Sequence, residues 1–248
     1  MRRIKLAIEY DGTGFAGFQR QGRGERTVQG VLEAALATLP GAVPRVVAAG
    51  RTDAGVHALE MIVHYDTADS VPIERVPLAL NARLPADLRA LWAEPAPPGF
   101  HARRSARWRA YRYRIRRGRG GALERNRVLF VPEPLDLSAL EAALALLVGR
   151  HDFAAFANRE RRGTVRTLYR AALRLEGPEV WLEFAGSGFL RGQVRAMVGT
   201  LLEVARGRRR PEAIAALLRE GDRARSGPTA PPQGLYFVAA GYRPWPMR

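Results

Sequence analysis

The chain has 248 residues and a formal net charge of +16, because 40 basic residues stand against 24 acidic ones. Hydrophobic residues make up 47%, which is typical of globular proteins and excludes a disordered chain. The chain has no cysteine and only four dispersed histidines, so disulfides, thiolate nucleophiles and cysteine-based zinc sites are excluded and we expect no metal. No apolar run approaches the roughly 20 residues that span a bilayer, and no signal peptide is evident, so we expect no membrane partner and a cytoplasmic location.

Periodicity predicts six elements in the first part of the chain. Residues 4–10 alternate like a half-buried strand, and residues 27–39 have helical periodicity behind Thr27, which is a good N-cap. The next elements are strands at 43–49 and 61–66, a helix at 73–84 that contains Pro77, and a strand at 88–94. The element order is therefore β-α-β-β-α-β.

The same order returns after a proline-rich stretch at 95–99. The second set comprises a strand at 108–116, a helix at 138–147, strands at 165–175 and 180–185, a helix at 193–206, a short extra helix at 211–219 and a strand at 235–240. We therefore expect an α+β fold of two ferredoxin-like halves, residues 1–103 and 104–248, that form a mostly antiparallel sheet with helices on one side and a central basic cleft.

Several loops are rich in glycine, arginine or proline. Residues 12–17 match the pattern G-x-G-x-x-G, but the next residues do not open an apolar helix, and the acid roughly 20 residues on, Glu33, lies inside a predicted helix. We therefore expect a flexible basic loop there instead of a dinucleotide site. The loops expected to be mobile until something binds are 21–26, 117–125, 158–163 and 221–233.

The run at 50–57, Gly-Arg-Thr-Asp-Ala-Gly-Val-His, places a carboxylate, Asp53, in a strongly basic chain. A simple explanation is a turn in which Gly55 takes positive φ. An acid on a surface that binds polyanions would repel the ligand unless it is used, and an ionised carboxylate beside Arg51 can act as nucleophile or base. The rival acids resemble local features: Asp11 precedes a turn, and Asp152 resembles a cap.

The strand at 108–116 is the second clear signal. Alternation puts Tyr111, Tyr113 and Ile115 on one face and Arg112, Arg114 and Arg116 on the other. If the tyrosine face lines the cleft, a ring there can stack on an extruded base while the arginines hold phosphates. The alternative is an ordinary amphipathic strand with a solvated basic face.

A third candidate is the pair Arg191 and Arg195, four residues apart at the predicted start of a helix. This spacing could aim both at a phosphate or at the Asp53 carboxylate. A solvated helix face explains the pair equally well.

Short segments in a fixed order carry a family resemblance. They are residues 10–13, 17–19, 50–57, 80–85, 100–103, 111–113, 151–156, 164–167, 188–195 and 234–236. Together they resemble the tRNA pseudouridine synthase A family, and the likeness runs from about residue 4 to about residue 242. Phe15, Phe18, Gly192, Gln193 and Ala196 depart from residues common in that family.

The resemblance implies a pseudouridine synthase fold and a cofactor-free isomerase that converts uridine to pseudouridine at positions 38, 39 and 40 of the tRNA anticodon stem-loop. It also implies a homodimer. Asp53 matches the catalytic aspartate, Tyr111 a tyrosine that packs on the target base, Arg51 an arginine associated with base flipping, and Arg195 one that pairs with the aspartate. The alternatives are a non-catalytic RNA-binding protein, since β-α-β-β-α-β units also build RNA-recognition modules, and a cofactor-dependent tRNA modifier.

Overall fold

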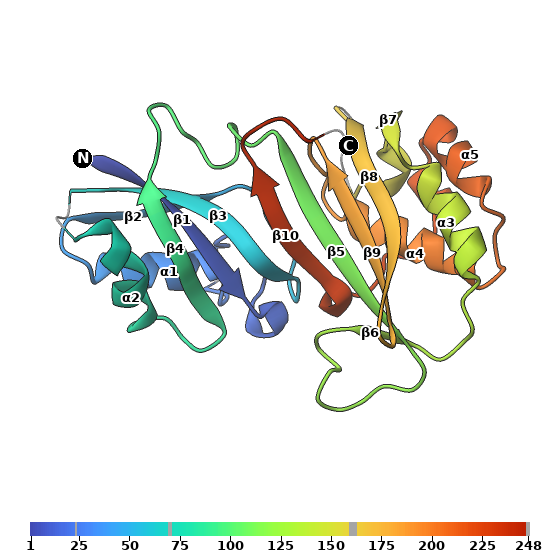
Figure 1. Cartoon of the computed structure of the whole chain (residues 1–248), viewed down its shortest axis with the longest axis horizontal. Coiled ribbons are helices and arrows are strands. Elements are labelled where there is room, and N and C mark those ends of the chain that lie inside the picture. The colour runs from blue at the N-terminus through green and yellow to red at the C-terminus, as the bar shows by residue number, and fades with distance from the viewer. Residues whose placement is uncertain (23, 69–70, 159–162, 247–248) are drawn as a thin grey trace. The chain divides into compact units, whose positions relative to one another are not determined.

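The computed structural model describes residues 1–22, 24–68, 71–158 and 163–246 (Figure 1). The chain divides into two compact units. Unit 1 comprises Met1–Arg107 and Tyr236–Pro244, and unit 2 comprises Trp108–Leu235 and Trp245–Arg248. The halves expected from the sequence, 1–103 and 104–248, differ from these units at residues 104–107 and 236–244, which fall in unit 1.

Unit 1 is built on a ferredoxin-like sheet. Its elements are β1 (Arg2–Tyr10), α1 (Val28–Ala37), β2 (Ala42–Ala48), β3 (His57–Thr67), α2 (Val76–Asn81), β4 (Leu88–Pro95) and most of β10 (Leu235–Gly241). The strand order is β4-β1-β3, with β2 also paired to β3, and all these pairs are antiparallel. β10 pairs with the start of β3 in the parallel direction, with Tyr236 opposite His57.

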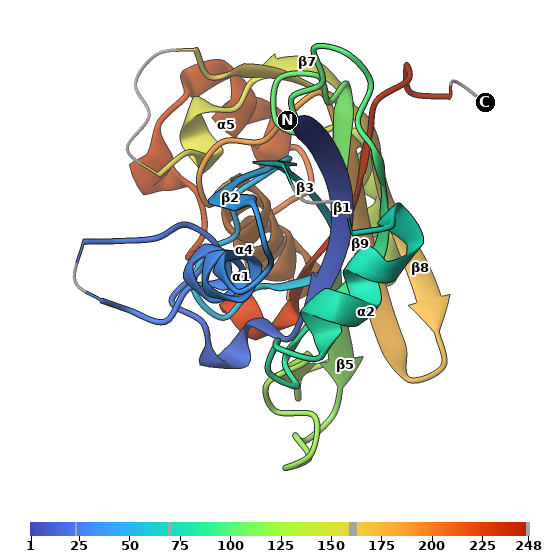
Figure 2. The ribbon, with the colours of Figure 1, turned by 90° about the vertical axis from the view of Figure 1, so that its left-hand side faces the viewer.

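Local sequence signals explain both helices of unit 1. The Thr27 hydroxyl accepts a hydrogen bond from the Gly30 N–H at 3.2 Å, so Thr27 caps α1 as predicted, an interaction worth about 1 kcal/mol. Pro77 falls in the first turn of α2, where its missing N–H is not needed, and the predicted helix at 73–84 is shortened to Val76–Asn81. α1 and α2 lie on opposite sides of β1 (Figure 2).

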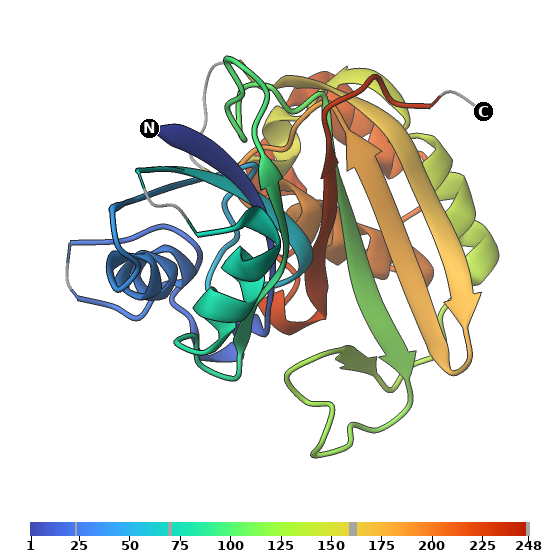
Figure 3. The same ribbon diagram turned by 60° about the vertical axis from the view of Figure 1, so that its left-hand side comes forward.

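Unit 2 has a second, mostly antiparallel sheet. Its elements are β5 (Trp108–Arg117), β6 (Leu129–Val131), α3 (Leu137–Ala145), β7 (Gly149–Asp152), β8 (Val165–Glu176), β9 (Glu179–Gly186), α4 (Gln193–Ala205) and α5 (Ala213–Glu220). The order is β5-β9-β8-β7, and β6 pairs with β5 in the parallel direction. Within the described part of this unit the helices gather on one face of the sheet (Figure 3). β6 and β7 were not predicted, because such short strands carry little periodicity.

The core of unit 2 follows from the alternation of β5. Tyr111 pairs with Phe184 and Tyr113 with Leu182, and all four side chains are buried. α4 is buried along most of its length. The prediction of a mixed α+β fold with mostly antiparallel strands is confirmed.

Three observations concern the loops and the surface. Two of the loops expected to be mobile, 21–26 and 158–163, contain residues that lie outside the described ones. These residues are 23 and 159–162. The loop at 221–233 contains a short 3-10 helix, Arg223–Arg225, and is fastened by hydrogen bonds described below, so the prediction of a mobile loop is wrong there. In the portion of the chain described, no helix is both long enough and apolar enough to cross a membrane.

Candidate active site

The loop between β2 and β3 carries Asp53 and is fixed at the residue before it. The Thr52 and Tyr10 hydroxyl oxygens lie 2.8 Å apart in a buried hydrogen bond. The Thr52 carbonyl accepts from the Phe18 N–H at 3.1 Å. The Asp53 backbone is therefore held by a strand, β1, and by the segment that follows it.

The glycine-rich segment at 12–17 packs against this loop. The Gly12 N–H donates to His57 Nδ1 at 3.0 Å, and a Cβ at Gly12 would lie 2.1 Å from the Val56 carbonyl oxygen. Gly17 has φ +100°, and a Cβ there would lie 2.9 Å from the Thr52 carbonyl oxygen. The prediction of a flexible loop is wrong for residues 12–18, because the glycines serve close backbone contact with the Asp53 loop.

Asp53 is half-buried at the turn that the loop makes. Its carbonyl accepts from the Val56 N–H at 3.2 Å, and Gly55 has φ +76° as predicted. The neighbouring Arg51 is exposed and does not form an ion pair with Asp53. Partial burial and the positive charge of Arg103 lower the pKa of Arg51.

The two rival acids have the local roles predicted for them. Asp11 accepts from the backbone N–H and the hydroxyl of Thr13, at 3.0 Å and 2.6 Å. Asp152 accepts from the Ala154 N–H at 2.9 Å. Each of these two carboxylates is thus part of a turn or cap.

Tyr111 lies on the buried face of β5 in unit 2. Its side chain is 9% exposed, and its ring meets the Phe189 ring edge-on, with centroids 4.9 Å apart. Two residues further on, the Tyr113 hydroxyl donates to the Pro231 carbonyl at 2.7 Å, and burial raises the pKa of Tyr113. Tyr111 therefore sits in an aromatic and apolar setting that suits a ring packed on a base.

The arginine face of β5 differs from the expectation that it holds phosphates. Arg112 pairs with Glu183 at 3.0 Å and lies over the Trp181 ring at 3.9 Å. Arg114 pairs with Glu179 at 2.6 Å and 2.8 Å, and these hydrogen bonds lower the pKa of Glu179. The ordinary amphipathic strand is the better description, since carboxylates already occupy these guanidinium groups.

Arg195 is in the first turn of α4, and Arg191 precedes the helix. α4 begins at Gln193 after Gly192, so helical spacing does not relate the two arginines, and that prediction is wrong. The Arg195 Nε donates to the Ala230 carbonyl at 2.8 Å. This contact fixes the plane of the guanidinium.

The loop that supplies the Ala230 carbonyl is itself built into unit 2. The Gly227 N–H donates to the Thr200 hydroxyl at 2.9 Å, and that hydroxyl donates to the Ala196 carbonyl at 2.9 Å. Arg223 donates to the Thr229 hydroxyl at 2.8 Å and to the Gly227 carbonyl at 3.1 Å. Sequence reasoning did not single out Thr200 or Arg223, since only the closed loop shows what they hold.

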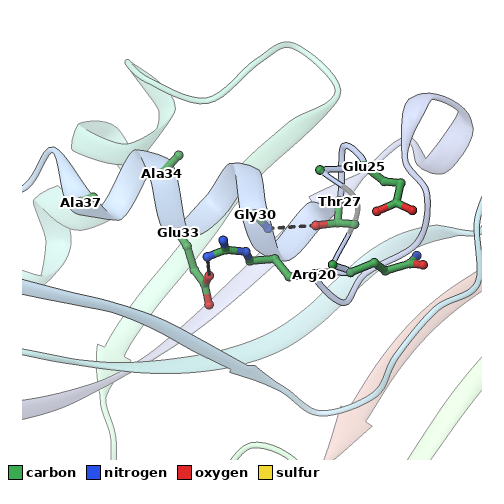
Figure 4. Close-up of a pocket in the computed structure, with 10 residues that line it drawn as sticks. Arg20, Glu25, Thr27, Gly30, Glu33, Ala34 and Ala37 are labelled. Carbon is green, nitrogen blue, oxygen red and sulfur yellow. Dashed lines mark hydrogen bonds and ion pairs between the residues drawn. The ribbon is translucent and has the colours of Figure 1, made fainter.

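A separate hollow of about 610 Å³ lies along α1 (Figure 4). Its polar side chains are already engaged, because Glu33 pairs with Arg20 at 3.4 Å and accepts from the Val46 N–H at 3.0 Å. Thr27, which also lines it, caps the helix. We assign it no ligand. No group of three or more His, Cys, Asp or Glu residues that could hold a metal ion occurs among the described residues.

Comparison with known proteins decides the family. The model of one family, described as tRNA pseudouridine synthase, matches residues 6–103 and 143–243. The chain belongs to the tRNA pseudouridine synthase family. Family membership identifies it as an isomerase that acts on uridine in tRNA, and it agrees with the resemblance carried by the motifs.

Individual relatives are similar over nearly their whole length. A tRNA pseudouridine synthase A of Thermus thermophilus is 57% identical over 98% of this chain and 97% of its own. One of Halalkalibacterium halodurans is 46% identical over 95% and 90%. Among solved structures, a chain of a Cbf5-Nop10-Gar1 complex is 11% identical over 95% of this chain and 49% of its own, with a TM-score of 0.39, a likeness too weak to bear on fold or function.

The structure thus distributes the four candidate residues between the units. Asp53 and Arg51 share one loop of unit 1. Tyr111 and Arg195 belong to unit 2, on β5 and α4. Arg195 and Tyr113 hold the consecutive carbonyls of Ala230 and Pro231, so β5 and α4 are tied through one loop.

Proposed function

We propose that the chain converts uridine to pseudouridine at positions 38, 39 and 40 of the tRNA anticodon stem-loop, with Asp53 acting on the extruded uridine and with no cofactor. The observation that carries the proposal is the setting of Asp53. Its carboxylate stands on a loop that is fixed through Thr52 and packed against the glycine-rich segment at 12–17. The resemblance of the motifs supports the tRNA positions.

The reaction needs no group from outside. The N1 glycosidic bond breaks, the uracil turns while it stays bound, and C5 joins the sugar. C5 then loses its proton and N1 takes one up, so the product is an isomer of the substrate. Asp53 either attacks the nucleotide or removes a proton from the sugar. A carboxylate can serve in either role.

The other site residues have proposed roles around the extruded base. Tyr111 packs on the uracil, Arg51 promotes base flipping, and Arg195 pairs with Asp53. The buried aromatic setting of Tyr111 and the fixed guanidinium of Arg195 support these roles. Unstacking a base costs a few kcal/mol, which arginines on flanking phosphates and a stacked ring can offset.

The assembly and location of the enzyme are part of the same proposal. By resemblance, the chain acts as a homodimer in which one tRNA contacts both subunits. Because the partner is tRNA, the activity belongs in the cytoplasm. Sedimentation of the purified chain with and without tRNA tests the dimer.

The direct test of the function uses unmodified tRNA and the protein alone. We expect pseudouridine to form without any added cofactor, and mapping of the product should place it at positions 38, 39 and 40. A non-catalytic RNA-binding protein would bind the tRNA and leave every uridine unchanged, which would contradict the proposal. A cofactor-dependent modifier would also give no product in this mixture.

A further inference from the structure

Unit 1 has two exposed arginines whose positive charges interact, Arg51 in the Asp53 loop and Arg103. Arg51 precedes Asp53 by two residues, and within the described part of unit 1 it makes no hydrogen bond or ion pair. Partial burial is the largest cause that lowers the pKa of Arg51, and the positive charge of Arg103 is the second. The two cations thus repel each other, so an anion between them would be bound favourably.

Hydrogen bonds place the segments that carry both arginines against the same stretch of β3. The Ala49 N–H donates to the Ile62 carbonyl at 2.8 Å, just before the loop that bears Arg51. The Ala102 N–H donates to His64 Nδ1 at 3.1 Å, just before Arg103. The two attachment points on β3 are only two residues apart, so the segments that carry Arg51 and Arg103 meet the same part of unit 1.

The turn that carries Arg103 is held unusually firmly for an exposed turn. His101 Nδ1 accepts from the backbone N–H groups of Arg103 and Arg104, at 3.3 Å and 3.2 Å. The Tyr242 hydroxyl donates to the Ala102 carbonyl at 3.0 Å. A fixed backbone lowers the entropy that an arginine loses when it binds a ligand.

We propose that Arg51 and Arg103 together bind one backbone phosphate of tRNA, on a nucleotide next to the uridine that Asp53 acts on. This inference rests on the proposed function. Guanidinium groups suit it because each presents a planar fork of donors to phosphate oxygens. Arg103 is thus a substrate-positioning residue of the site, and the shared phosphate relieves the repulsion between the two cations.

A double-mutant cycle tests whether the two arginines share one phosphate. The dissociation constant of unmodified tRNA is measured at several salt concentrations for the wild type, Arg51→Ala, Arg103→Ala and the double variant. We expect each single variant to weaken binding about fivefold and to lower the salt slope by about 1, as for one lost phosphate contact. The double variant should bind about as well as either single variant.

The control is Arg75→Ala, which removes another exposed arginine of unit 1 and should change the affinity less than twofold. A double variant whose loss equals the product of the two single losses, about 25-fold, would mean two separate contacts and would overturn the proposal. Wild-type affinity of Arg103→Ala would also overturn it. Because binding is the readout, these outcomes differ from a failure to form pseudouridine.

Discussion

The arginines on the β5 face of unit 2 and Arg51 in unit 1 have different surroundings. Unit 2 has 25 basic residues against 13 acidic ones, and unit 1 has 15 against 11. Yet on the β5 face of unit 2 the arginines meet glutamates, as Arg112 meets Glu183. In unit 1 the pKa of the exposed Arg51 is lowered by the positive charge of another arginine, Arg103. The net charge of a region therefore does not show which charges lie next to each of its arginines.

The largest expected effects come from glycines at which one backbone approaches another. A Cβ at Gly199 would lie 1.6 Å from the Pro228 carbonyl oxygen in unit 2, and one at Gly12 would lie 2.1 Å from that of Val56 in unit 1. We expect Gly199→Ala, inside a buried helix, to destabilise the fold by more than about 3 kcal/mol. Gly12→Ala, in a loop, should cost less stability and at least about tenfold in turnover.

For both variants, thermal unfolding measures stability and pseudouridine formation measures turnover. Gly121→Ala and Gly22→Ala are matched controls, one in each unit, because an added Cβ there meets no atom within 4 Å. Equal melting temperatures of Gly199→Ala and Gly121→Ala would show that the close approach of α4 to its loop is wrong.

The next effect is a pH dependence that arises from His64 in unit 1. Burial, together with the charges of Arg3, His101 and Arg104, lowers the pKa of His64 to about 4, against an opposing effect of Asp66. Between pH 6.5 and 4 the folded chain binds fewer protons at His64 than the unfolded chain, so acidification through that window reduces stability. The loss should reach about 3 kcal/mol near pH 4.

Urea unfolding at a series of pH values, for the wild type and His64→Gln, measures this loss. The variant should show a smaller decrease than the wild type over the same window. Identical pH profiles for the two chains would contradict a neutral His64 that accepts from Ala102 N–H.

A smaller effect is expected for the tie between β5 and its loop in unit 2. Tyr113→Phe removes the hydroxyl that donates to the Pro231 carbonyl. The loss of this hydrogen bond should destabilise the fold by about 1 kcal/mol, measured by urea unfolding. A variant as stable as the wild type would show that the hydroxyl is not needed to hold the loop.

The smallest effect compares Arg112, which pairs with a carboxylate, with Arg103, whose charge acts on Arg51. Arg112→Ala should lower the salt slope of tRNA binding by far less than the reduction of about 1 expected for Arg103→Ala, because Glu183 already neutralises Arg112. A reduction equal to that of Arg103→Ala would break the contrast between the two units.

Much of the fold follows from the sequence because its signals are local. Alternation in residues 108–116 identified the buried tyrosines of β5, and Thr27 identified the start of α1. Long-range pairing is different. Nothing near residue 236 shows that β10 pairs with β3 in unit 1, since that pairing joins segments about 180 residues apart.

The candidate site divides in the same way. Asp53 is conspicuous as an acid between glycines in a basic chain, and Gly55 predicts its turn. Arg103 and Thr200 carry no such signal, because their importance depends on which segments meet them. The segment at 12–18 was misjudged for this reason: its glycines indicate flexibility when read alone and close contact when the Asp53 loop is present.

The central claim is that the Asp53 carboxylate performs the isomerisation. Asp53→Asn keeps the shape and much of the hydrogen bonding of the side chain but removes its charge. Tritium release from tRNA labelled at uracil C5 measures turnover, a parallel titration measures tRNA affinity, and Asp152→Asn is the control for losing an aspartate. We predict affinity within about twofold of the wild type and a loss of at least about 1000-fold in rate. Turnover by Asp53→Asn within tenfold of the wild type would contradict the account.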